Sequence, residues 1–179
     1  MADREQAIDA IAPASDFNFL NGAWQAVERW LPRCGEGSDD WKERRAYLIQ
    51  RPMLGGTANA EEITYPDEPD FAVATFRCFD SPSGQWIIQS YVYGAKGNMP
   101  GMFEGHGVLI PAMRGRFDGK GRGEFVGSSE YEGRAVRCKY VWHDITAISA
   151  RWQRWFSFDD GSTWELNVTW ALTRERTMT

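Results

Sequence analysis

One arginine stands among aromatic residues in the segment 150–159, which reads ARWQRWFSFD. Side chains of a β-strand alternate between its two faces, so Arg154 shares a face with large rings. These rings are Trp152, Phe156 and Phe158. A guanidinium on a buried apolar face needs an anionic partner, because an isolated charge is costly to remove from water. Two kinds of partner are open: a carboxylate of the protein, Glu61 or Glu43, or the acid, phenolate or carbonyl of a bound ligand.

Polar residues on two earlier segments fall in phase with apolar neighbours and are candidates for the same interior. In 57–65 these are Asn59 and Glu61, and in the predicted strand before it they are Arg45 and Tyr47. Packing alone does not require so many polar groups inside one barrel, which favours a ligand that carries a polar group. The expected ligand-binding residues are Arg154, Trp152, Phe156, Tyr140, Asn59, Tyr47 and Arg45.

Catalysis in such an interior would need groups that hold and move protons. His106 lies near Glu104 in a glycine-rich stretch, and a loop histidine paired with a carboxylate can act as a general acid or base near neutral pH. A solvated loop histidine is the alternative. Tyr140 shares an apolar face with Trp142, where its hydroxyl would either orient a carbonyl or phenol or only complete the core. The expected catalytic residues are His106, Glu61 and Tyr140.

Several kinds of chemistry have no matching motif in the chain. The sequence contains no P-loop, no G-x-G-x-x-G after a predicted strand and no G-x-S-x-G elbow. Its 2 histidines lie far apart and its 3 cysteines form no C-x-x-C pair, so neither a metal site nor a cofactor is expected. The net charge of −5 disfavours nucleic acid as a partner.

The composition is typical of a globular protein with a large core. The chain has 179 residues, of which 42% are hydrophobic, and it fits a single domain over 1–179. The N-terminal residues are acidic and lack a long apolar run, so no signal peptide and no membrane span are expected. The isolated cysteines favour a cytoplasmic location. A small molecule is the expected partner, and a homodimer is a further option.

The expected elements are short β-strands separated by turns. Alternating large apolar and polar side chains predict strands at 24–31, 41–50, 57–65, 71–80, 85–93, 113–118, 123–131, 134–143, 150–159 and 162–173. The separators are rich in Gly, Pro, Asp and Ser, which favour turns. About ten short strands with hairpin-sized links predict an all-β fold, an up-and-down antiparallel β-barrel.

Two segments interrupt this series of strands. Residues 1–20 predict a helical plug for one end of the barrel, made of a short amphipathic helix that ends at Pro13 and a turn that carries Phe17 and Leu20. Residues 94–112 form a long glycine-rich loop, which is typical of a lid or of a mobile connection.

The first predicted strand begins with Gly22-Ala23-Trp24, which resembles the G-x-W signature of lipocalins. In that family an arginine just after the last barrel strand packs on the tryptophan and closes the end of the barrel. Arg174 follows Trp170-Ala171-Leu172-Thr173 and is in the matching place. The resemblance implies a cation–π contact between Arg174 and Trp24.

A wider resemblance covers most of the chain. Its phrases include Leu20-Asn21-Gly22-Ala23-Trp24, Arg51-Pro52-Met53-Leu54-Gly55-Gly56, Tyr131-Glu132-Gly133-Arg134, Trp142-His143-Asp144-Ile145-Thr146 and Thr163-Trp164-Glu165. Together they resemble a calycin-like family of bacterial domains of unknown function, the DUF1579-like proteins. The resemblance implies a lipocalin-type or fatty-acid-binding-protein-like barrel and no established activity. The chain departs from the usual pattern at Arg154, Trp155 and His143 and in its long 94–112 loop, which indicates a specialised ligand.

Two functions fit these observations. In the first, the barrel binds a small apolar or aromatic molecule whose polar or acidic group is recognised by Arg154. In the second, the same cavity belongs to a cofactor-free enzyme, an isomerase, cyclase or lyase, that acts on such a molecule by acid–base chemistry. A partner-binding domain with exposed aromatic residues is a third hypothesis, and it requires a contiguous apolar patch on the surface.

Overall fold

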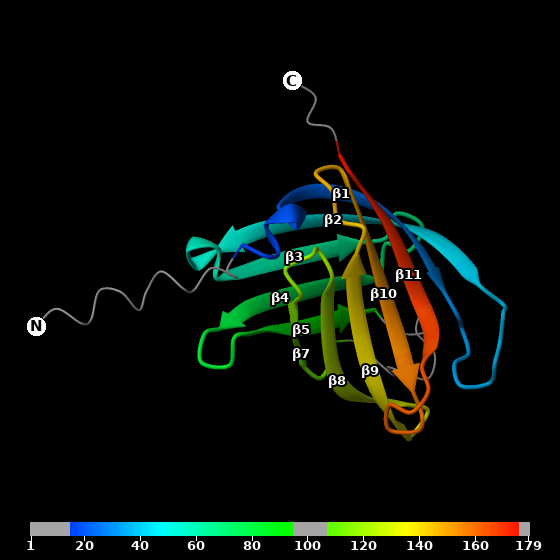
Figure 1. Cartoon of the computed structure of the whole chain (residues 1–179). Coiled ribbons are helices and arrows are strands. Elements are labelled where there is room, and N and C mark those ends of the chain that lie inside the picture. Colours follow the sequence, from blue (N-terminus) through cyan, green and yellow to red (C-terminus); the bar gives the residue numbers. More distant parts are fainter. Residues whose placement is uncertain (1–14, 95–106, 176–179) are drawn as a thin grey trace, which may run out of the picture.

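The computed structural model describes residues 15–94 and 107–175, which form an all-β barrel (Figure 1). Its strands are β1 (Gly22–Trp30), β2 (Lys42–Met53), β3 (Ala58–Thr64), β4 (Ala72–Asp80), β5 (Gln85–Tyr93), β6 (Val108–Leu109), β7 (Met113–Phe117), β8 (Gly123–Tyr131), β9 (Arg134–His143), β10 (Ser149–Ser157) and β11 (Glu165–Arg174). The helical elements of these described residues are two short 3-10 turns, η1 (Asn18–Leu20) and η2 (Leu54–Gly56). No helix within the described residues is long and apolar enough to span a membrane.

The strands are antiparallel, and most of them pair with their neighbours in sequence. The ladder runs β4-β3-β2-β1-β11-β10-β9-β8-β7-β5, and pairing of β4 with β5 closes it into a barrel of 10 strands. The short strand β6 adds 2 residues beside β5, opposite Tyr91 and Val92. The predicted antiparallel β-barrel is confirmed.

Large rings fill one end of the barrel. Phe17, which precedes η1, is buried inside this end of the barrel. Its ring centroid lies 5.0 Å from that of Trp86 and 5.1 Å from that of Phe117. Both Phe17 and Trp86 are at most 1% exposed. Burial of each such ring stabilises the fold by about 1.5–3 kcal/mol. The turn that carries Phe17 and Leu20 therefore acts as a plug, although it is a 3-10 turn with no α-helix.

Trp24 and Arg174 join the first and last strands of the barrel at this end. They are paired in the ladder between β1 and β11, and the Arg174 Cζ lies 4.3 Å from the centroid of the Trp24 ring. The predicted cation–π contact is confirmed. The same guanidinium donates hydrogen bonds to backbone carbonyls of the plug and of the β9–β10 connection, at Phe19, Asn21 and Ala147.

The structure departs from the predicted elements in a few places. Each predicted strand is present; β5, β8 and β9 have the predicted ends, and the ends of the others differ by a few residues at most. The strand β6 was not expected, and it lies within the segment predicted as a 94–112 loop. The helix expected before Pro13 lies outside the described residues, as does most of that loop.

Candidate functional site

The interior of the barrel holds a cavity of about 80 Å³. Most of its lining is apolar and includes Ile63, Ile88, Trp152 and Val168. Four charged side chains also line it: Glu28, Glu61, Arg77 and Arg154. Buried charges require partners, so the pairing of each of these groups decides what the cavity can bind.

Arg154 lies on β10 with only 7% of its surface exposed, and it lines the cavity. Its Nε donates a hydrogen bond to Oδ1 of Asn167 at 2.7 Å. Its Cζ lies 4.8 Å from the centroid of the Phe156 ring. Within the described part of the chain, no carboxylate oxygen lies within the 4.0 Å ion-pair distance of its nitrogens. The only side-chain acceptor that the described residues give this guanidinium is therefore a neutral amide.

Asn167 reaches Arg154 because β11 contains a bulge. The register between β10 and β11 shifts at this point: Arg154 pairs with Val168, whereas the next residue, Trp155, pairs with Leu166. Asn167 is the extra residue, and its side chain is fully buried. A bulge re-aims side chains in this way. Strict alternation predicts that Asn167 faces outward, and that expectation is wrong because the bulge reverses the phase of the strand.

Tyr140 is the neighbour of Arg154 in the ladder between β9 and β10, and both side chains line the cavity. Burial raises the pKa of the Tyr140 hydroxyl well above its usual value, although Arg154 acts in the opposite direction. The hydroxyl therefore stays protonated at neutral pH and can donate a hydrogen bond. Trp152 packs edge-on against it, with the ring centroids 5.0 Å apart. Arg154 and Tyr140 together form a wall rich in donors.

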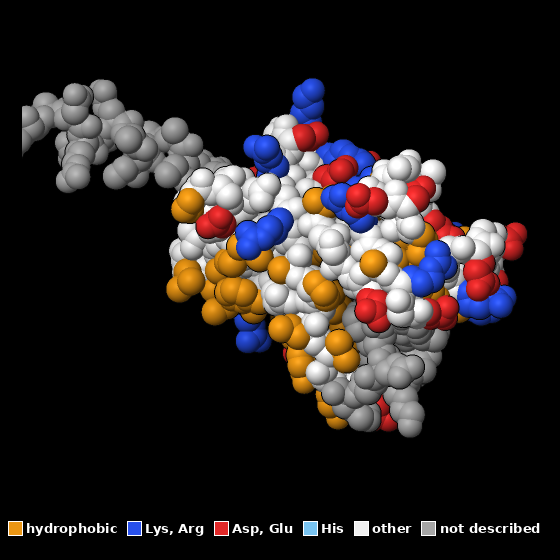
Figure 2. All heavy atoms as spheres, turned by 90° about the horizontal axis from the view of Figure 1, so that it is seen from below, with side chains coloured by type: hydrophobic (Ala, Val, Ile, Leu, Met, Phe, Trp, Pro, Cys, Tyr) orange, Lys and Arg blue, Asp and Glu red, His pale blue; other side chains and the backbone are white. Residues whose placement is uncertain are grey.

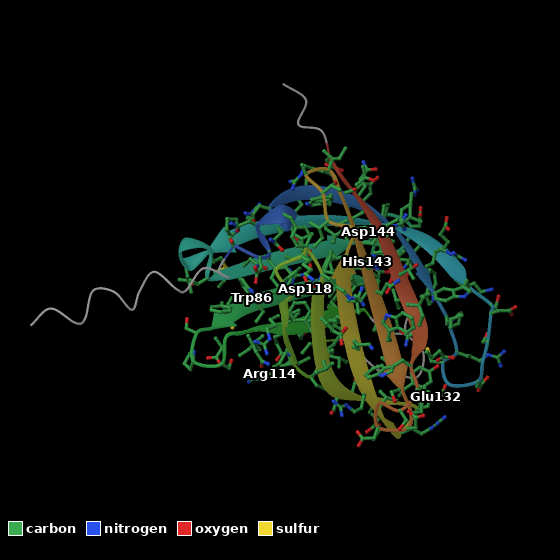
Figure 3. The ribbon with its side chains drawn as sticks, viewed as in Figure 1. Trp86, Arg114, Asp118, Glu132, His143 and Asp144 are labelled. Carbon is green, nitrogen blue, oxygen red and sulfur yellow. The ribbon has the colours of Figure 1, made fainter. Side chains whose placement is uncertain are left out.

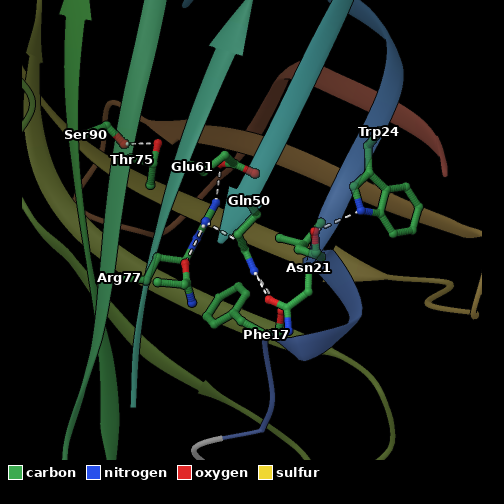
Figure 4. Close-up of polar contacts among 10 residues, drawn as sticks. Phe17, Asn21, Trp24, Gln50, Glu61, Thr75, Arg77 and Ser90 are labelled. Atoms are coloured by element: carbon green, nitrogen blue, oxygen red, sulfur yellow. Dashed lines mark hydrogen bonds and ion pairs between the residues drawn. The ribbon is translucent and has the colours of Figure 1, made fainter. Parts of the chain in front are cut away.

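Glu61 already has a partner within the protein (Figure 4). Its Oε2 lies 2.6 Å from Nη2 of Arg77, and the two residues are 5% and 4% exposed. The other terminal nitrogen of Arg77 donates to Oε1 of Gln50 and to Oδ1 of Asn59. Gln50 in turn donates to the backbone carbonyl of Phe17, which ties this network to the plug. Arg77 was not predicted as a site residue, although it shares an inward face with apolar residues of β4.

Glu28 also has a cationic partner. Its Oε2 lies 2.6 Å from Nε of Arg44, and Nη1 of Arg44 lies 3.0 Å from Oε1 of the less buried Glu68. The guanidinium of Arg44 stacks over aromatic rings, with its Cζ 4.1 Å from the centroid of Tyr65. This second ion pair was not predicted from the sequence either. The signal that could have revealed it is that Arg44 lies on the same face of the strand as the apolar residues Ala46 and Leu48.

The predicted inner face of β2 is wrong. The inward residues of this strand are Arg44, Ala46, Leu48 and Gln50. Arg45, expected in the ligand site, is exposed and pairs with Asp67 at 3.2 Å on the outer surface. Tyr47 shares this outer face, and Glu43 is exposed there as well. The prediction failed because the outer face of β2 carries its larger apolar side chains, whereas the inner face carries a charge and an amide.

Two hydroxyl groups line the wall opposite Arg154. Thr75 on β4 and Ser90 on β5 are paired in the ladder, and their side-chain oxygens lie 3.0 Å apart. Both residues line the cavity. Four strands separate β4 from β10 in either direction around the barrel, so Thr75 and Arg154 come from opposite sides.

Of the two histidines, only His143 lies within the described residues, and it does not line the cavity. His106 lies outside the described residues, so its predicted catalytic role stays a prediction. His143 lies beside Asp144 where β9 ends, with Nδ1 3.1 Å from Oδ2 of that aspartate (Figure 3). No group of three or more His, Cys, Asp or Glu residues suited to a metal ion occurs in the described ranges.

The outer surface carries apolar side chains on neighbouring strands. Figure 2 shows hydrophobic side chains gathered on one face of the molecule. Exposed large apolar residues of the β4–β6 region are Phe76, Tyr91, Tyr93 and Leu109, of which Tyr91 and Leu109 are paired in the ladder. A partner-binding domain would bind its partner through such a surface. No contact of the described residues indicates what would cover it.

Comparison with protein-family models and with curated proteins gives no relative from which a function could be transferred. No protein-family model matches the chain, and no curated protein matches it. The function must therefore be argued from the cavity itself.

Proposed function

We propose that the barrel binds a small apolar or aromatic molecule through an acidic group held by Arg154. The observation that carries this proposal is the pairing of the buried charges. Among the described residues these are Glu28, Arg44, Glu61, Arg77 and Arg154. Both glutamates are paired with the other two arginines. A buried cation is costly unless an anion joins it, and an acid in the cavity would supply that anion to Arg154.

The neighbours of Arg154 support the same ligand. A carboxylate can accept hydrogen bonds from the planar guanidinium and from the Tyr140 hydroxyl at the same time. The apolar part of the molecule would then lie against aliphatic lining residues such as Ile63, Ile88 and Val168. Asn167 orients the guanidinium through its bond to Nε, which leaves both terminal nitrogens for the ligand.

The volume of the cavity limits the size of this molecule. The cavity of about 80 Å³ has room for two or three water molecules at about 30 Å³ each, and it is about half of the ~150 Å³ that accepts benzene. A short organic acid therefore fits the inner side chains as they stand. An acid with an aromatic ring needs more room than this, so side chains that line the cavity would have to move.

The proposal includes kinship with the calycin-like barrels, and with the DUF1579-like proteins among them. Its support is the closed antiparallel barrel, the contact between Trp24 and Arg174, and the sequence phrases that resemble that family. A cytoplasmic location belongs to the same proposal and is supported by the three free cysteines.

The alternative of a cofactor-free enzyme stays a prediction without added support. Glu61 is engaged in an ion pair with Arg77, and the raised pKa of Tyr140 makes this hydroxyl a poor base near neutral pH. Because Arg77 holds Oε2 of Glu61 and the Tyr140 hydroxyl stays protonated, the binding function is favoured over acid–base catalysis by these two residues.

Titration calorimetry with acetate, butyrate and benzoate tests the binding proposal. The wild-type protein should bind at least one of these acids, and Arg154→Gln should weaken that binding by about 10- to 100-fold, as expected for a charge-assisted hydrogen bond. Arg45→Gln, which removes an exposed arginine of the outer surface, is the matched control and should bind as the wild type does. Equal affinities of the wild type and Arg154→Gln would contradict the proposal.

A further inference from the structure

The wall of the cavity that faces Arg154 carries a row of polar side chains. Glu61 on β3 is paired in the ladder with Thr75 on β4, and Thr75 is paired with Ser90 on β5. All three side chains line the cavity. Because they are neighbours across three consecutive strands, they form one continuous polar row on the inner face of the barrel.

This row has unused hydrogen-bonding capacity. Two hydroxyl groups carry two hydrogens, and the bond between Thr75 and Ser90 uses only one of them. Within the described residues neither hydroxyl has another side-chain partner. Oε1 of Glu61 and Nε of Arg77 are buried and have no hydrogen-bond partner either. The row therefore offers both donors and acceptors to a group that comes within reach.

The row carries little net charge. Arg77 neutralises Glu61 at 2.6 Å, and the hydroxyls of Thr75 and Ser90 are neutral. An ammonium group would bring an unmatched positive charge to this side, so a neutral polar group suits it better. A hydroxyl both donates and accepts hydrogen bonds, which matches the mixed capacity of the row.

We propose that the ligand is a short hydroxy acid, with its carboxylate on Arg154 and Tyr140 and its hydroxyl on Thr75 and Ser90. This inference rests on the proposed function, because it requires the acid to bind at Arg154. The apolar residues between the two walls contact the carbon chain. Because they offer no polar partner, the carboxylate can lie only at the Arg154 wall and the hydroxyl only at the opposite wall.

Matched pairs of acids that differ only by the hydroxyl test this proposal. Butyrate is compared with 4-hydroxybutyrate, and benzoate with 4-hydroxybenzoate, by titration calorimetry. The wild type should bind the better-fitting hydroxy acid about three- to tenfold more tightly than its partner, the value of one neutral hydrogen bond. The double variant Thr75→Val with Ser90→Ala should lose this preference and keep the affinity for the acid without a hydroxyl.

The outcomes separate this inference from the proposed function. Acids that bind in an Arg154-dependent way, with equal affinities for the two members of each pair, overturn the hydroxy-acid inference alone. A preference that survives in the double variant also overturns it. If the wild type binds none of these acids, both the hydroxy-acid inference and the proposed function are overturned. If the double variant does not fold, the single variants Thr75→Val and Ser90→Ala make the same comparison, and each should reduce the preference.

Discussion

Nη2 of Arg77 lies 2.6 Å from Oε2 of Glu61 inside the barrel. Arg154 is buried on the other side of the same cavity, yet its Nε bonds only to the neutral amide of Asn167. The two arginines are alike in burial, at 4% and 7% exposed, and differ in their partners. Arg77 is therefore neutralised within the fold, whereas Arg154 has no carboxylate partner among the described residues.

This difference predicts unequal costs when each arginine is replaced by methionine. Arg77→Met leaves Glu61 buried without a counter-ion and should lower the free energy of unfolding by about 3–5 kcal/mol. Arg154→Met removes one hydrogen bond to Asn167 and a cation that has no carboxylate partner among the described residues, so it should cost less than about 1.5 kcal/mol. Urea denaturation of the ligand-free proteins measures both values. Equal costs would mean that Arg154 also has a counter-ion within the protein.

A second prediction concerns the closure of the barrel by Arg174. Arg174→Ala removes the cation–π contact with Trp24 and hydrogen bonds to three backbone carbonyls. We expect a loss of about 2–4 kcal/mol in the free energy of unfolding. Arg174→Lys keeps the cation but lacks the planar fork, so its loss should be smaller. Thermal and urea unfolding check this order, and a neutral Arg174→Ala would show that the contact does not hold the barrel end.

Asp159 should make the stability depend on pH in the acid range. Hydrogen bonds from Thr163 and Ser157 lower the pKa of this carboxyl from 3.8 to about 2 in the folded protein. Between these values the unfolded chain binds more protons, so the contribution of Asp159 is present above pH 3.8 and is lost as the pH falls through about 2.

Unfolding measured from pH 5 to pH 2 should therefore show a flatter acid slope in Asp159→Asn than in the wild type. Asp160→Asn is the matched control, since Asp160 is exposed in the same turn and forms only a surface contact at 3.4 Å with Arg137. If both variants change the slope equally, the turn network around Asp159 is not its cause.

The cysteines should differ from one another in reactivity. Burial raises the pKa of the Cys34 thiol to about 11 and that of Cys138 to about 12. The thiolate is the reactive form, so iodoacetamide at pH 8 should leave both unmodified in the folded protein. Cys78 is half-buried and is the first residue expected to react. Peptide mass spectrometry locates the label, and rapid labelling of Cys138 would contradict the burial of this thiol.

The sequence was sufficient to predict the barrel, because alternation and turn residues are local signals. The strands β5, β8 and β9 begin and end at the predicted residues. Asn59 and Glu61 face inward as predicted, since β3 alternates regularly between buried and exposed positions. The contact of Arg174 with Trp24 followed from a resemblance that places both residues at the barrel end.

The composition of the site was harder to predict, because it depends on register and on pairing between distant strands. Arg44 and Arg77 are inward cations that alternation alone does not distinguish from outward ones. Asn167 faces inward only because one extra residue shifts the register between β10 and β11. Arg45 was assigned to the interior because the apolar residues beside it suggested a buried face, whereas the ion pairs of Arg44 stabilise the opposite orientation.

Native mass spectrometry of protein isolated from its own host can show whether an acid is bound at Arg154. We expect the wild type to carry a bound species with the mass of a small organic acid, and the control Arg45→Gln to carry it as well. Arg154→Gln, isolated in the same way, should lack it. If Arg154→Gln retains the same species, Arg154 does not hold the acid. If the wild-type barrel carries nothing and takes up no acid when titrated, the proposed binding function is wrong.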